Sequence, residues 1–188
     1  MRIAAFSRPH PSETANGDLW LSIPHKNGWR ITIIDGAGHG PAAAKAAGVA
    51  EAIFRSSEGR NLSEVLRCCH DELRGTRGAV MSIAEIVDNQ LTFVGVGNVD
   101  GLLVDSTGAK RLLPDRGMLG AALPSARPFT TNLTEPWVFV MHSDGVSDKF
   151  GANLMVNGII ASPEAFARDT VDAWGRNSDD ATLVVIHY

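Results

Sequence analysis

The sequence predicts an α+β fold in which sheets pack face to face and helices cover them. Strand-like segments come in runs joined by turn residues, and two helical segments stand together between the first run and the second. Helices and strands segregated in this way along a chain favour an α+β sandwich over an alternating α/β fold. With 188 residues, the chain has the ordinary length of one domain, so we expect a single domain over 1–188.

The first half of the chain is expected to contain three strands and two helices. Apolar and β-branched residues predict strands over 1–8, 18–23 and 29–35. Residues 41–57 are alanine-rich and begin with Pro41, a residue that suits the first turn of a helix. Apolar residues recur at helical spacing over 62–74 and predict a second helix there.

The second half is dominated by strands. Beyond Gly78 the pattern becomes strand-like, which predicts strands over 79–87, 90–96, 101–104, 127–133, 137–143 and 179–188. Asp88–Asn89 has the composition of a hairpin turn. Pro163 begins a helix that we expect over 163–174. The stretch 145–162 is expected to be loop.

Composition excludes several classes of protein. Lys plus Arg is 17 and Asp plus Glu is 21, which gives a net charge of -4 with no basic cluster, whereas nucleic-acid binders carry basic surfaces. The longest apolar runs, such as 137–141, fall far short of the ~18 residues that span a bilayer. Cys68 and Cys69 are the only cysteines, and adjacent cysteines make no disulfide framework. We therefore expect a cytoplasmic protein that binds neither nucleic acid nor membrane.

Aspartates stand at matching ends of four predicted strands. Asp35 and Asp144 each end an apolar strand, whereas Asp18 and the pair Asp179–Asp180 each begin one. If strands of the first kind run antiparallel to strands of the second, all these carboxylates meet at one edge of the sheets. Carboxylates held together raise one another's pKa values and destabilise the fold unless something neutralises them, and a cation is the usual remedy.

The donor type narrows the choice of cation. A site made of oxygen ligands favours Mg²⁺ or Mn²⁺ over zinc, which prefers His and Cys. Glycines lie beside three of the acids, at Gly17, Gly36 and Gly145, where they allow tight turns and let a backbone carbonyl reach a metal. An ordinary Asp-Gly turn explains any one of these acids by itself. Four at matching strand ends favour a carboxylate metal site.

A set of motifs resembles one enzyme family. The motifs are NGD (16–18), IDGAGHG (34–40), GNVDG (97–101), GMLG (117–120), SDGVSD (143–148) and SDDATLVVI (178–186). In this order they resemble the metal-dependent serine/threonine protein phosphatases of the PPM, or protein phosphatase 2C-like, family, and more narrowly its bacterial sporulation and stressosome branch. The resemblance runs from Asp18 to the end of the chain, and it implies a four-layer α-β-β-α sandwich of two mainly antiparallel sheets.

The resemblance also implies a metal site and a reaction. Asp35 matches the aspartate that bridges two Mn²⁺ or Mg²⁺ ions, the carbonyl of Gly36 binds one of them, and Asp18 is the N-terminal acid of the cluster. Asp144 and Asp179 match the acids on the other ion. The implied reaction is hydrolysis of phosphoserine or phosphothreonine by a metal-bridged hydroxide, with Asp35 and Asp18 as the catalytic residues.

Other positions match the motifs of the family only in part. Asp180 stands where many relatives have Asn and is expected to orient the site, and Asp148 is a candidate ligand for a third ion. Many relatives carry a histidine directly after the Asp-Gly pair, where this chain has Ala37, so His39 is the nearest candidate proton donor. No basic residue for the substrate phosphate stands at a fixed spacing, and Arg8 is the candidate.

The resemblance extends to the substrate. It implies a phosphorylated STAS-domain scaffold protein of a stressosome as the partner, which places the chain in stress-response signalling. The chain is too short for the flap subdomain of larger relatives, so substrate selection is expected to rest on loops, with 145–162 as the candidate.

Three other functions compete with this hypothesis. Cys68 and Arg74 satisfy the C-x5-R spacing of cysteine phosphatases, but CCHDEL lies within a helical pattern and lacks glycine. The segment WRITIIDGAGHG resembles a dinucleotide-binding turn, but Pro41 stands where the last glycine of that fingerprint belongs. A catalytically inactive scaffold or binding protein of the same fold is the third, and the complete set of acids argues against it.

Overall fold

The computed structural model describes residues 1–153 and 156–188. Its strands form two five-stranded sheets in which every neighbouring pair is antiparallel. The first sheet has the order β1 (Arg2–Arg8), β10 (Ala181–His187), β9 (Val138–His142), β6 (Asp100–Asp105), β7 (Gly108–Leu112). The second has the order β2 (Asp18–His25), β3 (Gly28–Gly36), β4 (Ala79–Val87), β5 (Gln90–Val96), β8 (Phe129–Asn132).

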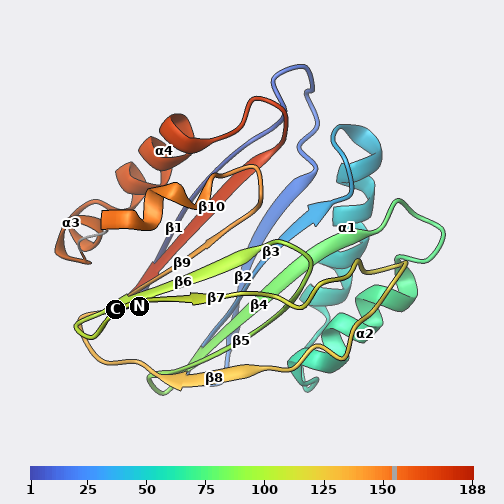
Figure 1. Cartoon of the computed structure of the whole chain (residues 1–188). Helices are drawn as coiled ribbons and strands as arrows, with labels where there is room; N and C mark the ends of the chain where they lie inside the picture. The colour runs from blue at the N-terminus through green and yellow to red at the C-terminus, as the bar shows by residue number, and fades with distance from the viewer. Residues whose placement is uncertain (154–155) are drawn as a thin grey trace.

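Helices cover the outer face of each sheet (Figure 1). Helices α1 (Pro41–Arg55) and α2 (Leu62–Glu72) lie on the β2–β3–β4 sheet, and α3 (Val156–Ala161) and α4 (Pro163–Trp174) lie on the other. The expected α+β class and the four-layer α-β-β-α order are therefore confirmed. None of the helices within 1–153 and 156–188 is both long and apolar enough to cross a membrane.

The alternation of side chains along β3 explains why two layers form on either side of it. Ile31 and Ile33 point between the sheets and join the central core, whereas Ile34 points to the other face and packs with α1 and α2. All three are fully buried. Because both faces of β3 are covered, its residues read as a continuous apolar run rather than an alternating one.

The expectation of loop over 145–162 is wrong for the part that the structure describes. A 3₁₀ helix spans Asp148–Asn153, and α3 follows it. Phe150 and Ile159 are buried in the same core as Val140 and Leu183 of the sheet. Apolar side chains spaced too sparsely to show a helical period are held here by packing on β9, which a local pattern does not reveal.

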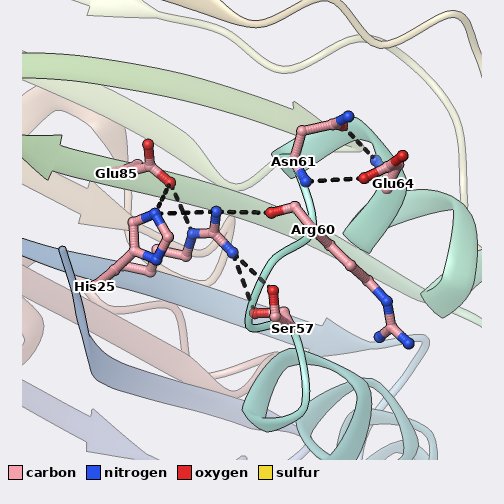
Figure 2. Close-up of polar contacts among 7 residues, drawn as sticks. His25, Ser57, Arg60, Asn61, Glu64 and Glu85 are labelled. Carbon is pink, nitrogen blue, oxygen red and sulfur yellow. Dashed lines mark hydrogen bonds and ion pairs between the residues drawn. The ribbon is translucent and has the colours of Figure 1, made fainter.

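A buried arginine ties the helical layer to the end of its sheet. Arg30 in β3 donates hydrogen bonds to the carbonyl oxygens of Ser57 (3.0 Å) and Arg60 (2.8 Å), in the connection between α1 and α2, and to Glu85 Oε2 (2.7 Å) (Figure 2). Asn61 and Glu64 then cap α2 reciprocally. These contacts fix the far end of α1, whose near end follows the GAGHG turn.

The chain termini and the candidate aspartates lie at opposite ends of the sandwich. Arg2 pairs with His187, and the two chain termini lie side by side (Figure 1). At the other end of the same strands, Arg8 pairs with Ala181, immediately after the Asp179–Asp180 pair. The aspartates singled out in the sequence therefore lie at the end away from the termini.

Candidate metal centre

Antiparallel pairing brings the aspartates of the two sheets to one edge. Asp18, at the start of β2, is the direct partner of Asp35 near the end of β3. In the other sheet, Asp144 follows β9 and Asp179 precedes β10, and these strands are antiparallel neighbours. Asp35, Asp144 and Asp179 line one pocket, and Asp18 is the strand partner of Asp35 without lining the pocket itself.

Ser143 joins the sheets beneath the aspartates. Its hydroxyl donates to Asp18 Oδ2 at 2.6 Å and accepts from the backbone N–H of Thr182 at 3.0 Å. Asn16 Oδ1 accepts the backbone N–H of Asp18 at 3.0 Å. The Asp18 carboxylate is thus buried and held in one orientation by residues from both sheets.

Three of the carboxylates line one pocket of about 170 Å³. Asp35, Asp144 and Asp179 line it together with Ala37, Gly38, Val80, Asn98 and Met118. Asn98 Nδ2 donates to Asp144 Oδ2 at 2.6 Å, which fixes one oxygen of that carboxylate. The pocket has the size of a small charged group rather than of a folded peptide.

Burial and mutual repulsion raise the pKa values of Asp18, Asp35 and Asp144. Burial, followed by the charges of Asp18, Asp144 and Asp179, raises the pKa of Asp35 to about 9. Burial likewise raises the pKa of Asp18 to about 7, although the hydrogen bond from Ser143 opposes the shift. The pKa of Asp144 is raised by burial and by Asp179, against the nearby Arg176. Burial and repulsion therefore outweigh the positive charge near these acids.

The residues present fit a hard divalent cation by their chemistry. All donors at the edge are oxygens, which suits Mg²⁺ or Mn²⁺, and their raised pKa values are what an added positive charge would reverse. The buried Oδ2 of Asp180 has no hydrogen-bond partner among the described residues. In 1–153 and 156–188 no three Asp, Glu, His or Cys side chains already enclose an ion position.

The backbone of Gly36 is tightly enclosed. A Cβ at this position would lie 2.1 Å from the carbonyl oxygen of Ala43, so α1 can approach β3 only because residue 36 is glycine. This close packing sets the chain directly after Asp35 against the first turns of α1. It also holds the Gly36 peptide beside the carboxylate that precedes it.

The two further aspartates of the sequence hypothesis lie elsewhere. Asp180 is buried outside the lining of the pocket and accepts the backbone N–H of His10 at 2.8 Å through Oδ1. Asp148 is exposed and its carboxylate pairs with Arg111 at 2.8 Å. The structure therefore does not bring Asp148 into the pocket.

The candidate proton donor and the candidate phosphate ligand are both engaged with other groups. His39 Nδ1 lies 3.0 Å from Glu13 Oε1, and its ring stacks on His10 at 4.4 Å between centroids. Arg8 donates to the carbonyl oxygen of Arg176 at 3.0 Å. Neither His39 nor Arg8 is among the residues that line the acidic pocket.

The structure excludes two of the competing functions. Cys68 lies inside α2 rather than at a phosphate-binding loop, and Arg74 follows the helix end. Burial raises the pKa of the adjacent Cys69 thiol to about 12, which leaves it unreactive. The strand after α1 and α2, β4, pairs antiparallel with β3, whereas a dinucleotide-binding unit needs a parallel crossover.

Two contact residues of the site have no assigned role in the sequence analysis. Ser143 precedes Asp144 in the SDGVSD motif, and Asn98 lies in the GNVDG motif. Their place inside recognised motifs was the available signal. What they do, bridging the sheets and orienting Asp144, depends on contacts across 125 and 46 positions of sequence.

Two helix-covered antiparallel sheets with an acidic edge are the fold of the PPM-type, protein phosphatase 2C-like, phosphatases. The chain belongs to the Stage II sporulation protein E (SpoIIE) family, whose sequence profile matches residues 25–188. This agrees with the bacterial sporulation and stressosome branch that the motifs indicated.

Individual relatives place the chain within this family. It is 25% identical over 118 residues to the phosphoserine phosphatase RsbX of Bacillus subtilis (strain 168), an alignment that covers 61% of this chain and 59% of the relative's length. A structure solved in work on the bacterial stressosome as a modular system that controls secondary messenger signaling is 30% identical, with a TM-score of 0.88 and 97% of each chain covered. Crystalline RsbX in complex with magnesium shares the fold at a TM-score of 0.81 and 19% identity, over 97% of this chain and 92% of that one.

Proposed function

We propose that this chain is a metal-dependent protein serine/threonine phosphatase, with residues 1–188 as one catalytic domain. The observation that carries the proposal is the convergence of Asp35, Asp144 and Asp179 on a pocket of about 170 Å³, with the buried Asp18 paired beside Asp35. A site that keeps mutually repelling acids together gains from a bound cation. Membership of the SpoIIE family and the similarity to a phosphoserine phosphatase support the same activity.

In this proposal, two Mn²⁺ or Mg²⁺ ions are held by the carbonyl of Gly36 and by the carboxylates of Asp18, Asp35, Asp144 and Asp179. The alternative is that a third ion binds as well. Bound divalent ions supply charge neutralisation for the phosphate and a water of lowered pKa as nucleophile. Such help matters because hydrolysis of phosphate monoesters is among the slowest uncatalysed reactions. Magnesium in crystalline RsbX supports the choice of metal.

Side chains of the protein orient the metal-binding carboxylates, and the size of the pocket limits which substrates enter. Ser143 holds one oxygen of Asp18, and Asn98 holds one oxygen of Asp144, so both carboxylates present their remaining oxygens in defined directions. The small pocket admits a phosphoryl group at the tip of a side chain. Ala37 cannot donate a proton, so in this proposal the leaving serine or threonine oxygen takes its proton from water. His39, two positions further along the chain, is the histidine closest to Ala37 in the sequence.

We infer that the substrate is a phosphorylated STAS-domain scaffold protein of a stressosome, in the cytoplasm. The support is the similarity to RsbX and to a structure from work on the stressosome. Fold alone does not select a substrate. The specific test is release of phosphate from such a phosphorylated scaffold compared with an unrelated phosphoprotein.

An inactive scaffold or binding protein of the same fold is the second candidate. The observation that favours it is Ala37, which removes the side chain that many PPM phosphatases place directly after the Asp-Gly pair. The two candidates differ in turnover. A phosphatase hydrolyses phosphoester in the presence of metal, whereas a scaffold binds its partner and releases no phosphate.

The test is hydrolysis of p-nitrophenyl phosphate and of a phosphoserine peptide with Mn²⁺, with Mg²⁺ and with EDTA. Asp35→Asn keeps the side-chain shape and removes the charge, and we expect kcat to fall by about 100-fold or more, since electrostatic groups at a reacting centre contribute on that order. Asp172→Asn on the exposed surface of α4 is the matched control and should leave kcat unchanged. Activity that survives both EDTA and Asp35→Asn would reject the proposal.

A further inference from the structure

We propose that Arg77 binds the phosphoryl group of the substrate at the mouth of the acidic pocket. This inference rests on the proposed phosphatase function and deepens it. The sequence offered no basic residue at a fixed spacing for this role, and its candidate, Arg8, is bonded to the carbonyl oxygen of Arg176. Arg77 comes from a different part of the chain, the turn between α2 and β4.

The turn that carries Arg77 is fixed against the pocket. The backbone N–H of Ala37, a pocket residue, donates to the carbonyl oxygen of Gly78 at 3.0 Å. Within the turn, the hydroxyl of Thr76 accepts the N–H of Gly78 at 3.0 Å and donates to the carbonyl oxygen of Leu73 at 2.7 Å. The backbone at Arg77 is therefore held beside the pocket wall by hydrogen bonds on both sides.

The side chain of Arg77 reaches the rim of the pocket. A Cβ built on Gly38, which lines the pocket, would lie 2.9 Å from Nη1 of Arg77. Met118, another lining residue, also lies close to this turn, with its Sδ 3.0 Å from a Cβ built on Gly78. The guanidinium thus stands over Gly38, next to the chain segment that carries Asp35.

The charge of Arg77 is available for a ligand. Its guanidinium takes part in no hydrogen bond or ion pair with the residues that the structure describes, and the side chain is exposed. Arg74, in the same turn region and equally exposed, contacts His70 at 3.5 Å and Asp71 at 3.9 Å. The charge of Arg176 already acts on Asp144, whose pKa it lowers against the effect of burial.

A phosphoryl group needs such a partner at this place. Bound cations would neutralise the phosphoryl oxygens on the side of the aspartates. The phosphoryl oxygens on the opposite side would lie next to Gly38 and the turn that carries Arg77. A guanidinium offers a planar pair of N–H donors that matches two phosphoryl oxygens. A glycine at position 38 leaves the space between this guanidinium and the pocket open.

The decisive experiment measures KM and kcat for p-nitrophenyl phosphate and for a phosphoserine peptide. With Arg77→Ala we expect KM for both substrates to rise about tenfold, the typical effect of losing one charge-assisted hydrogen bond, and kcat to stay within about twofold. Arg77→Lys should recover part of the loss. Arg74→Ala is the matched control and should match wild type on both substrates.

Binding of inorganic phosphate to the Mn²⁺-loaded protein gives a readout that needs no turnover. Phosphate should raise the Tm of wild type and of Arg74→Ala, and should raise that of Arg77→Ala at about tenfold higher concentration. A wild-type protein that binds phosphate but turns over neither substrate would contradict the phosphatase proposal and leave this comparison decisive for Arg77. Unchanged KM and phosphate binding in Arg77→Ala would overturn the inference, as would a loss confined to the phosphopeptide.

Discussion

At the scale of single residues, the defining feature is a set of carboxylates that the fold keeps without compensating charge. Their positions were predictable because a strand end is a local property and antiparallel pairing then fixes which ends meet. Asp18 and Asp35 are direct partners in β2 and β3 for this reason. Arg77 was not predictable, because the position of its guanidinium close to Gly38 depends on how the turn before β4 docks on a residue about 40 positions earlier.

The raised pKa of Asp35 predicts how the stability of the metal-free protein depends on pH. Its folded-state pKa is about 9, against an ordinary value of 3.8, so between these values the folded state holds a proton that the unfolded state has released. Stability is then highest below about pH 4 with respect to this group and falls as pH rises toward 9, by at most about 1.4 kcal/mol per pH unit for one proton. Asp18, with a pKa of about 7, adds to the same trend over the lower part of the range.

Urea unfolding in EDTA at pH 5.5, 7.0 and 8.5 measures this trend. We expect the unfolding midpoint to fall with pH in wild type and to fall less in Asp35→Asn, which carries no titrating group at that position. Saturating Mn²⁺ should flatten the wild-type profile, because a bound cation favours the ionised carboxylates. A midpoint that rises with pH in EDTA would contradict the uncompensated state of these acids.

At the scale of elements, the sequence predicted what is locally periodic and missed what is held only by packing. The helices at 41–57 and 62–74 were expected within a few residues of α1 and α2, because alanine content and an Asn61 cap are local signals. The 3₁₀ helix and α3 were missed because a few apolar residues, such as Phe150 and Ile159, pack on the sheet without a visible period.

The contact between the helical layer and its sheet depends on Arg30. Its side chain is only 4% exposed and serves two backbone carbonyls and Glu85. Arg30→Met keeps an unbranched apolar stem but leaves Glu85 and these carbonyls without their donor, and a buried group that loses its partner costs about 3–5 kcal/mol for a charge pair. We expect a loss of unfolding free energy of that order.

Denaturant unfolding of Arg30→Met at pH 7 tests this expectation. Arg55→Met is the control, since Arg55 lies on the exposed side of α1 and pairs only with Glu51 in the same helix. That pair is worth about 0.5 kcal/mol or less, so the control should stay close to wild type. Equal losses in the two variants would show that the network at Arg30 contributes no more than a surface ion pair.

At the scale of the whole molecule, each of the two sheets contributes a different pair of aspartates to the site. Asp18 and Asp35 come from one sheet, whereas Asp144 and Asp179 flank strands of the other. Ser143 is the hydrogen-bonded link between them. Any ion held by acids of both sheets therefore acts as a crosslink between the halves of the sandwich, and its binding free energy adds to the stability of the whole fold.

This linkage predicts a rise in Tm on addition of metal. At a free Mn²⁺ concentration of 100 times Kd, one bound ion stabilises the folded state by about 2.7 kcal/mol. For a protein of this size each kcal/mol shifts Tm by about 2–4 °C, so we expect a rise of about 5–10 °C in thermal unfolding followed by circular dichroism.

Two variants separate a crosslink from a nonspecific effect of the salt. Asp144→Asn and Asp35→Asn each remove a carboxylate from a different sheet, and both should reduce the metal-dependent rise in Tm while Asp172→Asn keeps it. Each substitution also removes a carboxylate that repels its neighbours when no metal is bound. In EDTA, the Tm of both variants should therefore be equal to or higher than that of wild type. A full Mn²⁺ response in both variants would place the ion outside the acidic edge, whereas a response lost in only one variant would assign the ion to a single sheet.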